Sequence, residues 1–385
     1  MKVVVDADDT PGLKLGQVAG PTPMHRSIEW YRAFHRFVLS EPGLKPIADL
    51  YGGAAVMDLP GADLVRLHTK AVGFFHRLRD PNLANGFSNV VDAFARLPPS
   101  AQSDADRAPT LDALRDRGYA DLAPLSAERT EAMRAYLDAS PLVPSDALRR
   151  PERETTPTDA NILRRDWNLA YVPRSRLLRM PGLLPIAVEP AHLNLIRRYL
   201  GAPPILTDIS AWKSFAGEAG PKDARDAQLF HFDLDNYRFC KLFIYLTDVD
   251  SESGPHIFVP TTHRLETISA KRPPDGNPDQ AAFDQWYFET VRKSEADVVK
   301  WFGTAPDAIT GPAGKRFIAD TQGLHRGCPP ANRDRWVLQF VFGTTPATVW
   351  FESHRPRAFT DWDGSAFRSS GDLAAYCLSI LFPGA

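Results

Sequence analysis

Two positions in the sequence place metal-binding residue types side by side. His231 and Asp233 stand two residues apart in "LFHFDLD" (229–235), where apolar and polar residues alternate. Side chains at positions i and i+2 of a strand point to the same face. A strand here would therefore present the imidazole and the carboxylate together, with Asp235 on the same face.

The opposite face of this predicted strand is apolar. It would carry Phe230, Phe232 and Leu234. We expect these side chains to pack the larger sheet of the fold onto neighbouring helices, while the polar face turns inward.

A downstream segment, "FIADTQGLHRGCPPANRDRW", supplies two further residue types. His325 follows Asp233 after 91 intervening residues, and Arg335 lies ten residues further on, where a strand begins. Two imidazoles and one carboxylate leave positions open on a metal, as in non-haem Fe(II) oxygenases, and a 2-oxo acid and O2 can occupy them. The far carboxylate of 2-oxoglutarate needs a fixed, two-pronged cation, which arginine provides and lysine does not. The set predicts that His231, Asp233 and His325 bind Fe(II) and carry the catalysis, with 2-oxoglutarate and O2 as co-substrates.

Each residue of this set also has an ordinary interpretation. An isolated His-x-Asp is more often a surface pair, a lone histidine after a glycine is often solvated, and Arg335 alone is more often a strand-edge charge. Their order, each at the end of a predicted strand, favours the metal site. Arg333 remains a competing anion clamp, because it lies two residues earlier on the same strand face.

Apolar residues recur at helical spacing in the first half of the chain. This spacing predicts helices within residues 23–80 and over residues 188–201. Ser126 is the expected N-cap of a further helix. A polar, proline-rich stretch (96–110) indicates a linker or exposed loop. We predict an N-terminal helical extension over residues 1–105, which would add helices to the outer sheet face, form a homodimer surface or wall off the substrate entrance.

From about residue 204 the period changes to two, and short strands follow without intervening helices. The predicted strands are 205–215, 228–235, 240–249, 256–260, 315–320, 335–344 and 347–353. This pattern predicts an α+β protein whose core, within residues 106–385, is a double-stranded β-helix (jelly roll) with helices packed on the larger sheet.

An insertion over residues 264–303 interrupts these strands. It combines basic residues such as Arg264 and Lys271 with the aromatic residues Phe283 and Trp286. We predict a lid that closes over the ligand, with Arg264 contacting the substrate. The alternative is a solvated excursion with one amphipathic helix packed on the barrel.

Composition and charge argue against several classes of protein. A net charge of −2 provides no excess of positive charge that would favour binding to nucleic acid or to an anionic membrane. No apolar run approaches the roughly 18 residues of a membrane helix, and Met1–Thr10 lacks the pattern of a signal peptide. Cys240, Cys328 and Cys377 form no CxxC pair. We expect a cytoplasmic protein that acts on a small molecule.

Residues from about 110 to 345 resemble the phytanoyl-CoA dioxygenase family of Fe(II)- and 2-oxoglutarate-dependent oxygenases. The likeness lies in "LRDRGYADLAPLSAERTEAMRAYL", in "FHFDLDNYRFCKLFIYLTDVDSESGPHIFVPTTHR" and in "FIADTQGLHRGCPPANRDRW". The resemblance implies that His231, Asp233 and His325 bind iron and that Arg335 binds the C5 carboxylate of 2-oxoglutarate.

Three other positions are expected to help bind the cofactor. Lys241 begins a strand where the family often has Gln or Asn facing the cavity, although a solvated lysine would suit the position equally well. Ser214 lies on a strand expected to line the same cavity. Thr261 stands in the corner "VPTTH", where the family usually has Gly and Ser.

Substrate contacts are expected from Trp212, on the strand of Ser214, and from Asp235 and Arg264. His256 and His263 lie beside proline turns and are interpreted as corner residues, not as ligands. The histidines between residues 23 and 80 are interpreted as structural or surface residues.

The predicted activity is hydroxylation or another oxidation of a small-molecule metabolite, with bacterial natural-product biosynthesis as one setting. The acid at Asp233 argues against halogenation, which needs a small residue there to leave room for chloride. Desaturation, cyclisation and epimerisation remain open. The alternatives are a non-catalytic jelly-roll protein that binds a metal or ligand, and a zinc hydrolase. Arg335 argues against the first, and the lack of a general base beside a ligand argues against the second.

Overall fold

The computed structural model describes residues 108–144, 163, 167–200, 204–217, 229–233, 235, 239–274, 276–290, 292–343, 374, 377 and 378. Its helices are α5 (Ala108–Arg117), α6 (Ala127–Asp138), α9 (Arg174–Leu177), α10 (Leu183–Ala187), α11 (Pro190–Leu200), α12 (Leu265–Lys271), α13 (Asp279–Asp284), the π-helix η8 (Gln285–Glu289) and α14 (Glu295–Phe302). Its strands are β1 (Tyr119–Leu122), β2 (Val143–Pro144), β3 (Leu169–Tyr171), β4 (Ile205–Ser214), β5 (Phe239–Tyr245), β6 (His256–Phe258), β7 (Asp307–Ile309), β8 (Arg316–Ala319), β9 (His325–Gly327) and β10 (Arg335–Gly343).

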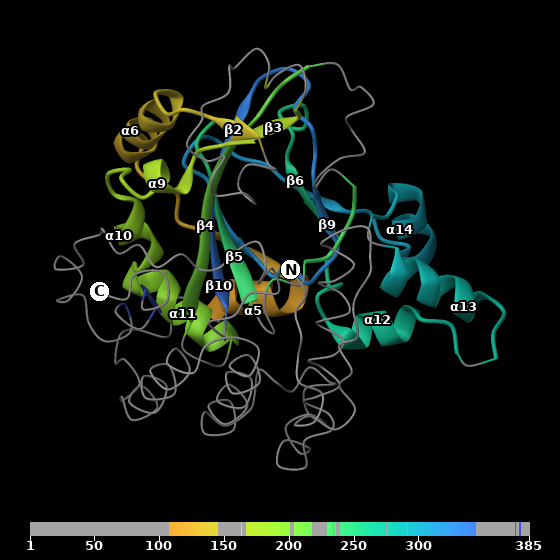
Figure 1. Cartoon of the computed structure of the whole chain (residues 1–385). Coiled ribbons are helices and arrows are strands. Elements are labelled where there is room, and N and C mark those ends of the chain that lie inside the picture. The colour runs from red at the N-terminus through yellow and green to blue at the C-terminus, as the bar shows by residue number, and fades with distance from the viewer. Residues whose placement is uncertain are drawn as a thin grey trace, which may run out of the picture.

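The strands form two antiparallel sheets (Figure 1). Residues of both sheets line a cavity. The larger sheet has the order β1-β8-β5-β10-β4-β3-β2, and the smaller sheet has the order β7-β6-β9. Helices α9, α10 and α11 lie on the outer side of the larger sheet, whereas α12, α13 and α14 lie together beside β9 (Figure 1). This arrangement confirms the predicted antiparallel architecture with helices on the larger sheet.

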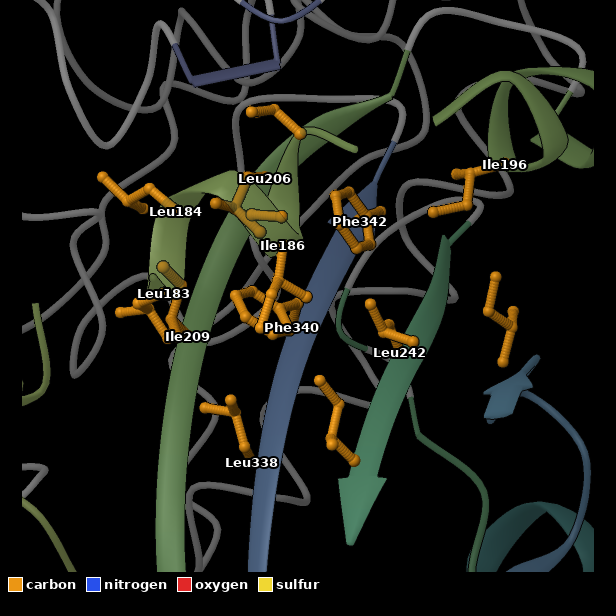
Figure 2. Packing of buried hydrophobic residues seen from close by; sticks show 14 of the residues in the cluster. Leu183, Leu184, Ile186, Ile196, Leu206, Ile209, Leu242, Leu338, Phe340 and Phe342 are labelled. Atoms are coloured by element: carbon orange, nitrogen blue, oxygen red, sulfur yellow. The ribbon is translucent and has the colours of Figure 1, made fainter. Parts of the chain in front are cut away.

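The outer face of the larger sheet forms the main hydrophobic core with the helices. Leu242 of β5 and Phe340 of β10 are fully buried there, and Ile186 and Ile196 of the helices pack in the same cluster (Figure 2). Each such side chain contributes about 1.5–3 kcal/mol on burial. A one-residue slip of β10 would turn Arg335 into this core, so burial fixes the strand register.

The inner face of the larger sheet meets the smaller sheet. Phe243 of β5 stacks on Phe317 of β8, with ring centroids 5.0 Å apart. Both belong to a second buried cluster, together with Tyr245 and with Phe258 of β6. This aromatic packing holds the two sheets together, and Lys241 projects from the same face of β5.

A glycine turn allows β6 to approach the segment that follows β9. Gly254 has a φ of +75°, and a Cβ at this position would lie 2.5 Å from the carbonyl oxygen of Cys328. Glycine therefore suits both the left-handed backbone and the close approach. The Cys328 N–H donates to the Pro255 carbonyl at 3.0 Å, which fixes the start of β6.

All but one of the predicted strands that fall on described residues are present. The segments 205–215, 240–249, 256–260, 315–320 and 335–344 correspond to β4, β5, β6, β8 and β10. Ser126 caps α6, as expected, by accepting a hydrogen bond from the Arg129 N–H at 3.3 Å. The predicted strand at 229–235 is wrong: its described residues form only isolated bridges, at Phe230 and His231.

Other predictions lie outside the described residues. These are the helices of 23–80, the extension 1–105 as a whole and the strand at 347–353. In the part of the chain that the structure describes, no helix is long and apolar enough to span a membrane.

Candidate metal centre

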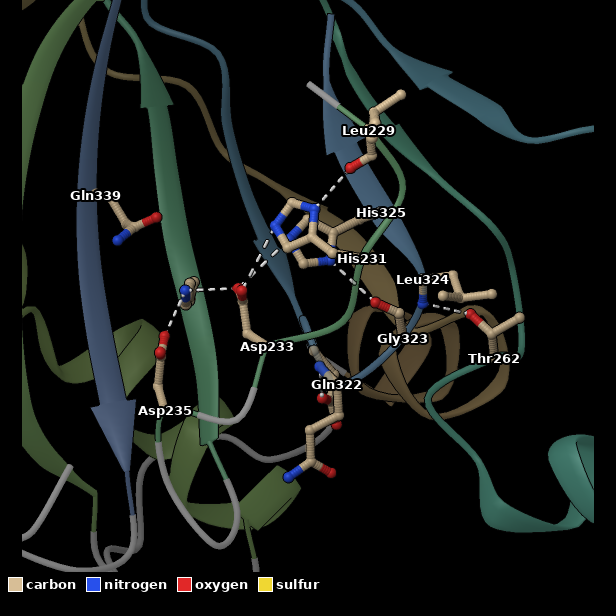
Figure 3. Close-up of polar contacts among 12 residues, drawn as sticks. Leu229, His231, Asp233, Asp235, Thr262, Gln322, Gly323, Leu324, His325 and Gln339 are labelled. Atoms are coloured by element: carbon tan, nitrogen blue, oxygen red, sulfur yellow. Dashed lines mark hydrogen bonds and ion pairs between the residues drawn. The ribbon is translucent and has the colours of Figure 1, made fainter. Parts of the chain in front are cut away.

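His231, Asp233 and His325 converge on one point between the two sheets (Figure 3). Their ligand atoms all lie within 4.8 Å of one another. Nε2 of His231 is 3.5 Å from Oδ1 of Asp233, and Nε2 of His325 is 3.3 Å from Oδ2. No second group of three metal-binding residues is found among the described residues.

Backbone hydrogen bonds, not a regular strand, bring these ligands together. His231 and His325 exchange two N–H to carbonyl hydrogen bonds, at 2.9 and 2.8 Å. The Asp233 N–H donates to the Thr321 carbonyl at 2.7 Å. Two segments far apart in the sequence are thereby held in a fixed register at the site.

A backbone carbonyl orients each histidine. Nδ1 of His231 lies 2.8 Å from the Leu229 carbonyl oxygen, and Nδ1 of His325 lies 2.9 Å from that of Gly323 (Figure 3). A carbonyl oxygen only accepts hydrogen bonds, so each Nδ1 carries a proton. In the neutral rings, Nε2 then presents its lone pair toward Asp233.

This donor set fits a divalent cation. Two imidazole lone pairs and a carboxylate face each other at 3.3–3.5 Å, an arrangement that a positive ion between them would stabilise. Burial keeps the pKa of His231 well below its usual value, so this ring is neutral and able to bind metal. Two imidazoles and one carboxylate are the ligands of non-haem Fe(II) centres.

Asp233 is also held by a buried lysine. Nζ of Lys241 donates to Oδ2 of Asp233 at 2.7 Å and lies 2.5 Å from a carboxylate oxygen of Asp235. Burial opposes ionisation of Asp233, but the Lys241 ammonium and the two histidines keep its pKa well below the usual value. The two carboxylates in turn raise the pKa of Lys241 despite its burial. Asp233 is therefore an ionised carboxylate at neutral pH.

Arg335 is a buried cation at the start of β10. It is 5% exposed, and its Nη2 donates to Oγ of Ser214 at 3.1 Å. Its Nε has no hydrogen-bond partner, and no carboxylate of the described residues pairs with it. Burial lowers the pKa of Arg335, but a guanidinium remains charged in proteins. A buried, unpaired positive charge is costly, and an anionic ligand would remove that cost.

His231, Asp233, His325 and Arg335 line one cavity of about 220 Å³. Both sheets contribute to its wall. Trp212 and Ser214 of β4, Gln339 of β10 and His256 of β6 are among the lining residues. A ligand bound in this cavity can therefore reach the metal site and Arg335 together.

The remaining predicted residues lie away from the cavity wall. Arg333, the competing clamp, is about half exposed and pairs with Asp250 at 2.7 Å. The backbone N–H of Thr261 bonds to the chain before β1, and Arg264 is the N-cap of α12. Asp235 is connected to the site through Lys241, not through the cavity wall.

The apolar face next to the metal ligands packs differently from the prediction. Phe230 is buried in a cluster with Phe283 of the insertion, and the Phe232 ring stacks on Tyr287 with centroids 5.2 Å apart. The His231 segment pairs with β9 of the smaller sheet, and the insertion helices lie beside β9 (Figure 1). These phenylalanines therefore meet the insertion and not the helices of the larger sheet. Leu234 lies outside the described residues.

The described residues of the insertion do not lie at the cavity. None of them lines the wall, and Phe283, Trp286 and Tyr287 are buried against Phe230 and Leu324. The described residues of the insertion form the helices beside β9, and its role as a lid stays a prediction.

Sequence reasoning missed several residues of the cavity wall. His256 was interpreted as a corner residue, yet its ring lies 5.2 Å from that of His325 and within 13° of parallel. Gln339 could have been found, because it lies on the same strand face as Arg335, four residues on. Tyr171 belongs to a strand of only three residues, too short to show a periodic pattern.

No protein family model and no curated protein matches this chain, so the resemblance to phytanoyl-CoA dioxygenases stays a prediction. Among solved structures, the chain is similar to the epimerase SnoN in complex with Fe3+, alpha-ketoglutarate and nogalamycin RO (17% identity, 62% of this chain and 84% of that chain, TM-score 0.41). It is also similar to the carbocyclase SnoK from nogalamycin biosynthesis (19%, 64% and 85%, TM-score 0.39) and to EctD from S. alaskensis with bound Fe (15%, 64% and 82%, TM-score 0.40). These similarities are too weak to transfer an activity to this chain.

Proposed function

We propose that this protein is an Fe(II)- and 2-oxoglutarate-dependent oxygenase that oxidises a small molecule. One observation carries the proposal: the buried Arg335, which no described carboxylate neutralises, lines the same cavity as the ligand set of His231, Asp233 and His325. A dicarboxylic oxo acid can bind a metal at one end and a guanidinium at the other. A protein that binds a metal but no oxo acid has no need of the Arg335 guanidinium.

The chain's own residues have distinct roles in this proposal. His231, Asp233 and His325 would hold the iron, and the carbonyls behind the two histidines would keep their rings in place. Arg335 would bind the far carboxylate. When bound, iron, 2-oxoglutarate and O2 would together supply an oxidant for C–H bonds, with one oxygen atom of O2 ending in succinate as CO2 is released.

Other residues would support the cofactor and the substrate. Ser214 would orient the Arg335 guanidinium through the hydrogen bond that it accepts, and Lys241 would keep Asp233 ionised and in position. Trp212 would contact the substrate from the cavity wall. Asp233 would supply the carboxylate ligand and leave no place for a halide, so we further propose an oxidation of a metabolite other than halogenation, such as hydroxylation.

The test is consumption of 2-oxoglutarate by the purified protein reconstituted with Fe(II). We expect O2-dependent formation of succinate, even without substrate at a slow rate, and its loss in Asp233→Ala. A candidate substrate should then accelerate succinate formation. A protein that binds iron and 2-oxoglutarate but never forms succinate would be a binding protein, and the proposal would be wrong.

A further inference from the structure

His256 is a buried polar residue of the cavity wall to which the proposed function gives no role. It is 7% exposed, and its Nε2 is enclosed without a hydrogen-bond partner. Its ring lies against those of His325, Phe243 and Phe317, at centroid distances of 5.2, 5.0 and 5.5 Å. Buried polar groups in proteins are nearly always hydrogen-bonded, so an unpaired one in a cavity wall indicates a missing partner.

The position of His256 relates it to both ends of the proposed ligand. On one side its ring stacks on the metal ligand His325. On the other, its backbone N–H donates to the Tyr245 hydroxyl at 2.9 Å, and His256 and Tyr245 line the same cavity as Arg335. An oxo acid that reaches from the metal to Arg335 would therefore pass beside this imidazole.

An imidazole ring carries at least one N–H, so His256 can donate a hydrogen bond to an oxygen of a ligand in the cavity that it lines.

We propose that His256 is a binding residue for the oxo acid and donates a hydrogen bond to it between the metal and Arg335. This inference rests on the proposed function. The alternative is a packing role alone, in which the ring only supports His325.

Calorimetric titration of the Ni(II)-loaded protein with 2-oxoglutarate separates these roles without turnover. His256→Phe keeps a flat ring for stacking but cannot hydrogen-bond, whereas His256→Gln keeps a donor but loses the ring. We expect the Phe variant to raise the Kd for 2-oxoglutarate about tenfold or more, and the Gln variant to stay within about threefold of wild type, a small change in binding free energy. The Kd for Ni(II) should be unchanged in both, which would show that the site is intact.

His192→Phe is the matched control, because His192 is equally buried but lies in α11, away from the cavity wall. It should bind 2-oxoglutarate like wild type. Unchanged affinity in His256→Phe, or equal losses in the Phe and Gln variants, would overturn the role of His256 while leaving the proposed function standing. Failure of the wild-type Ni(II) protein to bind 2-oxoglutarate would overturn both.

Discussion

Phe230 and Lys293 exchange two backbone hydrogen bonds, at 3.0 Å from the Phe230 N–H and 2.7 Å from the Lys293 N–H. The bridge joins the insertion to the residue immediately before the metal ligand His231. The Lys293 side chain is 1% exposed, and its ammonium lies 4.8–5.7 Å from the ring centroids of three aromatic residues, Phe232, Trp286 and Tyr287. The chain just before His231 is therefore hydrogen-bonded to a buried lysine whose ammonium is surrounded by aromatic rings.

The first prediction concerns the effect of pH on this buried lysine. Burial, followed by the charge of Arg292, lowers the pKa of Lys293 from 10.5 to about 7. Between these values the unfolded chain binds more protons than the folded one, so the contribution of Lys293 to stability improves as pH rises. Relative to Lys293→Met, the wild type should gain up to about 1.4 kcal/mol of unfolding free energy per pH unit in this window. The aromatic rings favour the ammonium, so they would raise its pKa in the folded state and narrow the window.

Urea unfolding of both proteins across this pH window measures the effect. Lys300→Met, at an exposed position of α14, is the control for replacing a lysine by methionine. A constant difference between wild type and Lys293→Met would show that Lys293 does not titrate in the window.

The second prediction concerns the three ligands. His231→Ala, Asp233→Ala and His325→Ala each remove a donor from a cavity that water can refill, so the fold should persist. We expect each variant to lose at least about tenfold in metal affinity and to lose 2-oxoglutarate consumption. Metal titration together with thermal unfolding checks this. Wild-type metal affinity and turnover in all three variants would rule out this ligand set.

The third prediction compares two arginines near the same strand. Arg335→Leu removes a buried guanidinium and should weaken 2-oxoglutarate binding by about 1.5–3 kcal/mol, or roughly tenfold to more than a hundredfold. Arg333→Leu should change it little, because Arg333 is half exposed and pairs with Asp250. Metal affinity serves as the control in both variants. The reverse order would assign the anion site to Arg333.

The sequence was sufficient to predict the antiparallel sheets and the set of His231, Asp233 and His325 that the structure brings together, for clear physical reasons. One face of strands such as β5 and β10 packs against helices, and the other face lines the cavity. Polar residues can therefore stand only at alternate positions of these strands. This alternation places Arg335 on the inward face of β10, whereas it left Lys241 open between the cavity and solvent. Residue types that bind metals also stand out in an otherwise apolar run, as His231 does.

Features that depend on contacts between distant segments could not be predicted in this way. The segment of His231 looks like a strand, but its hydrogen bonds go to isolated partners in β9 and in the insertion. The packing of Phe230 against the insertion depends on where a separate segment folds. His256 reaches the cavity because Gly254 allows β6 to approach Cys328 closely, and periodicity carries no information about that approach.

The most direct test of the central claim is the visible absorption spectrum of the anaerobic Fe(II)-loaded protein during titration with 2-oxoglutarate. We predict a weak charge-transfer band that grows to saturation, because the oxo acid binds the metal while Arg335 holds its far carboxylate. Arg335→Leu should require a higher concentration to reach the same band. A protein that has bound Fe(II) at His231, Asp233 and His325 but shows no band at saturating 2-oxoglutarate would contradict the claim.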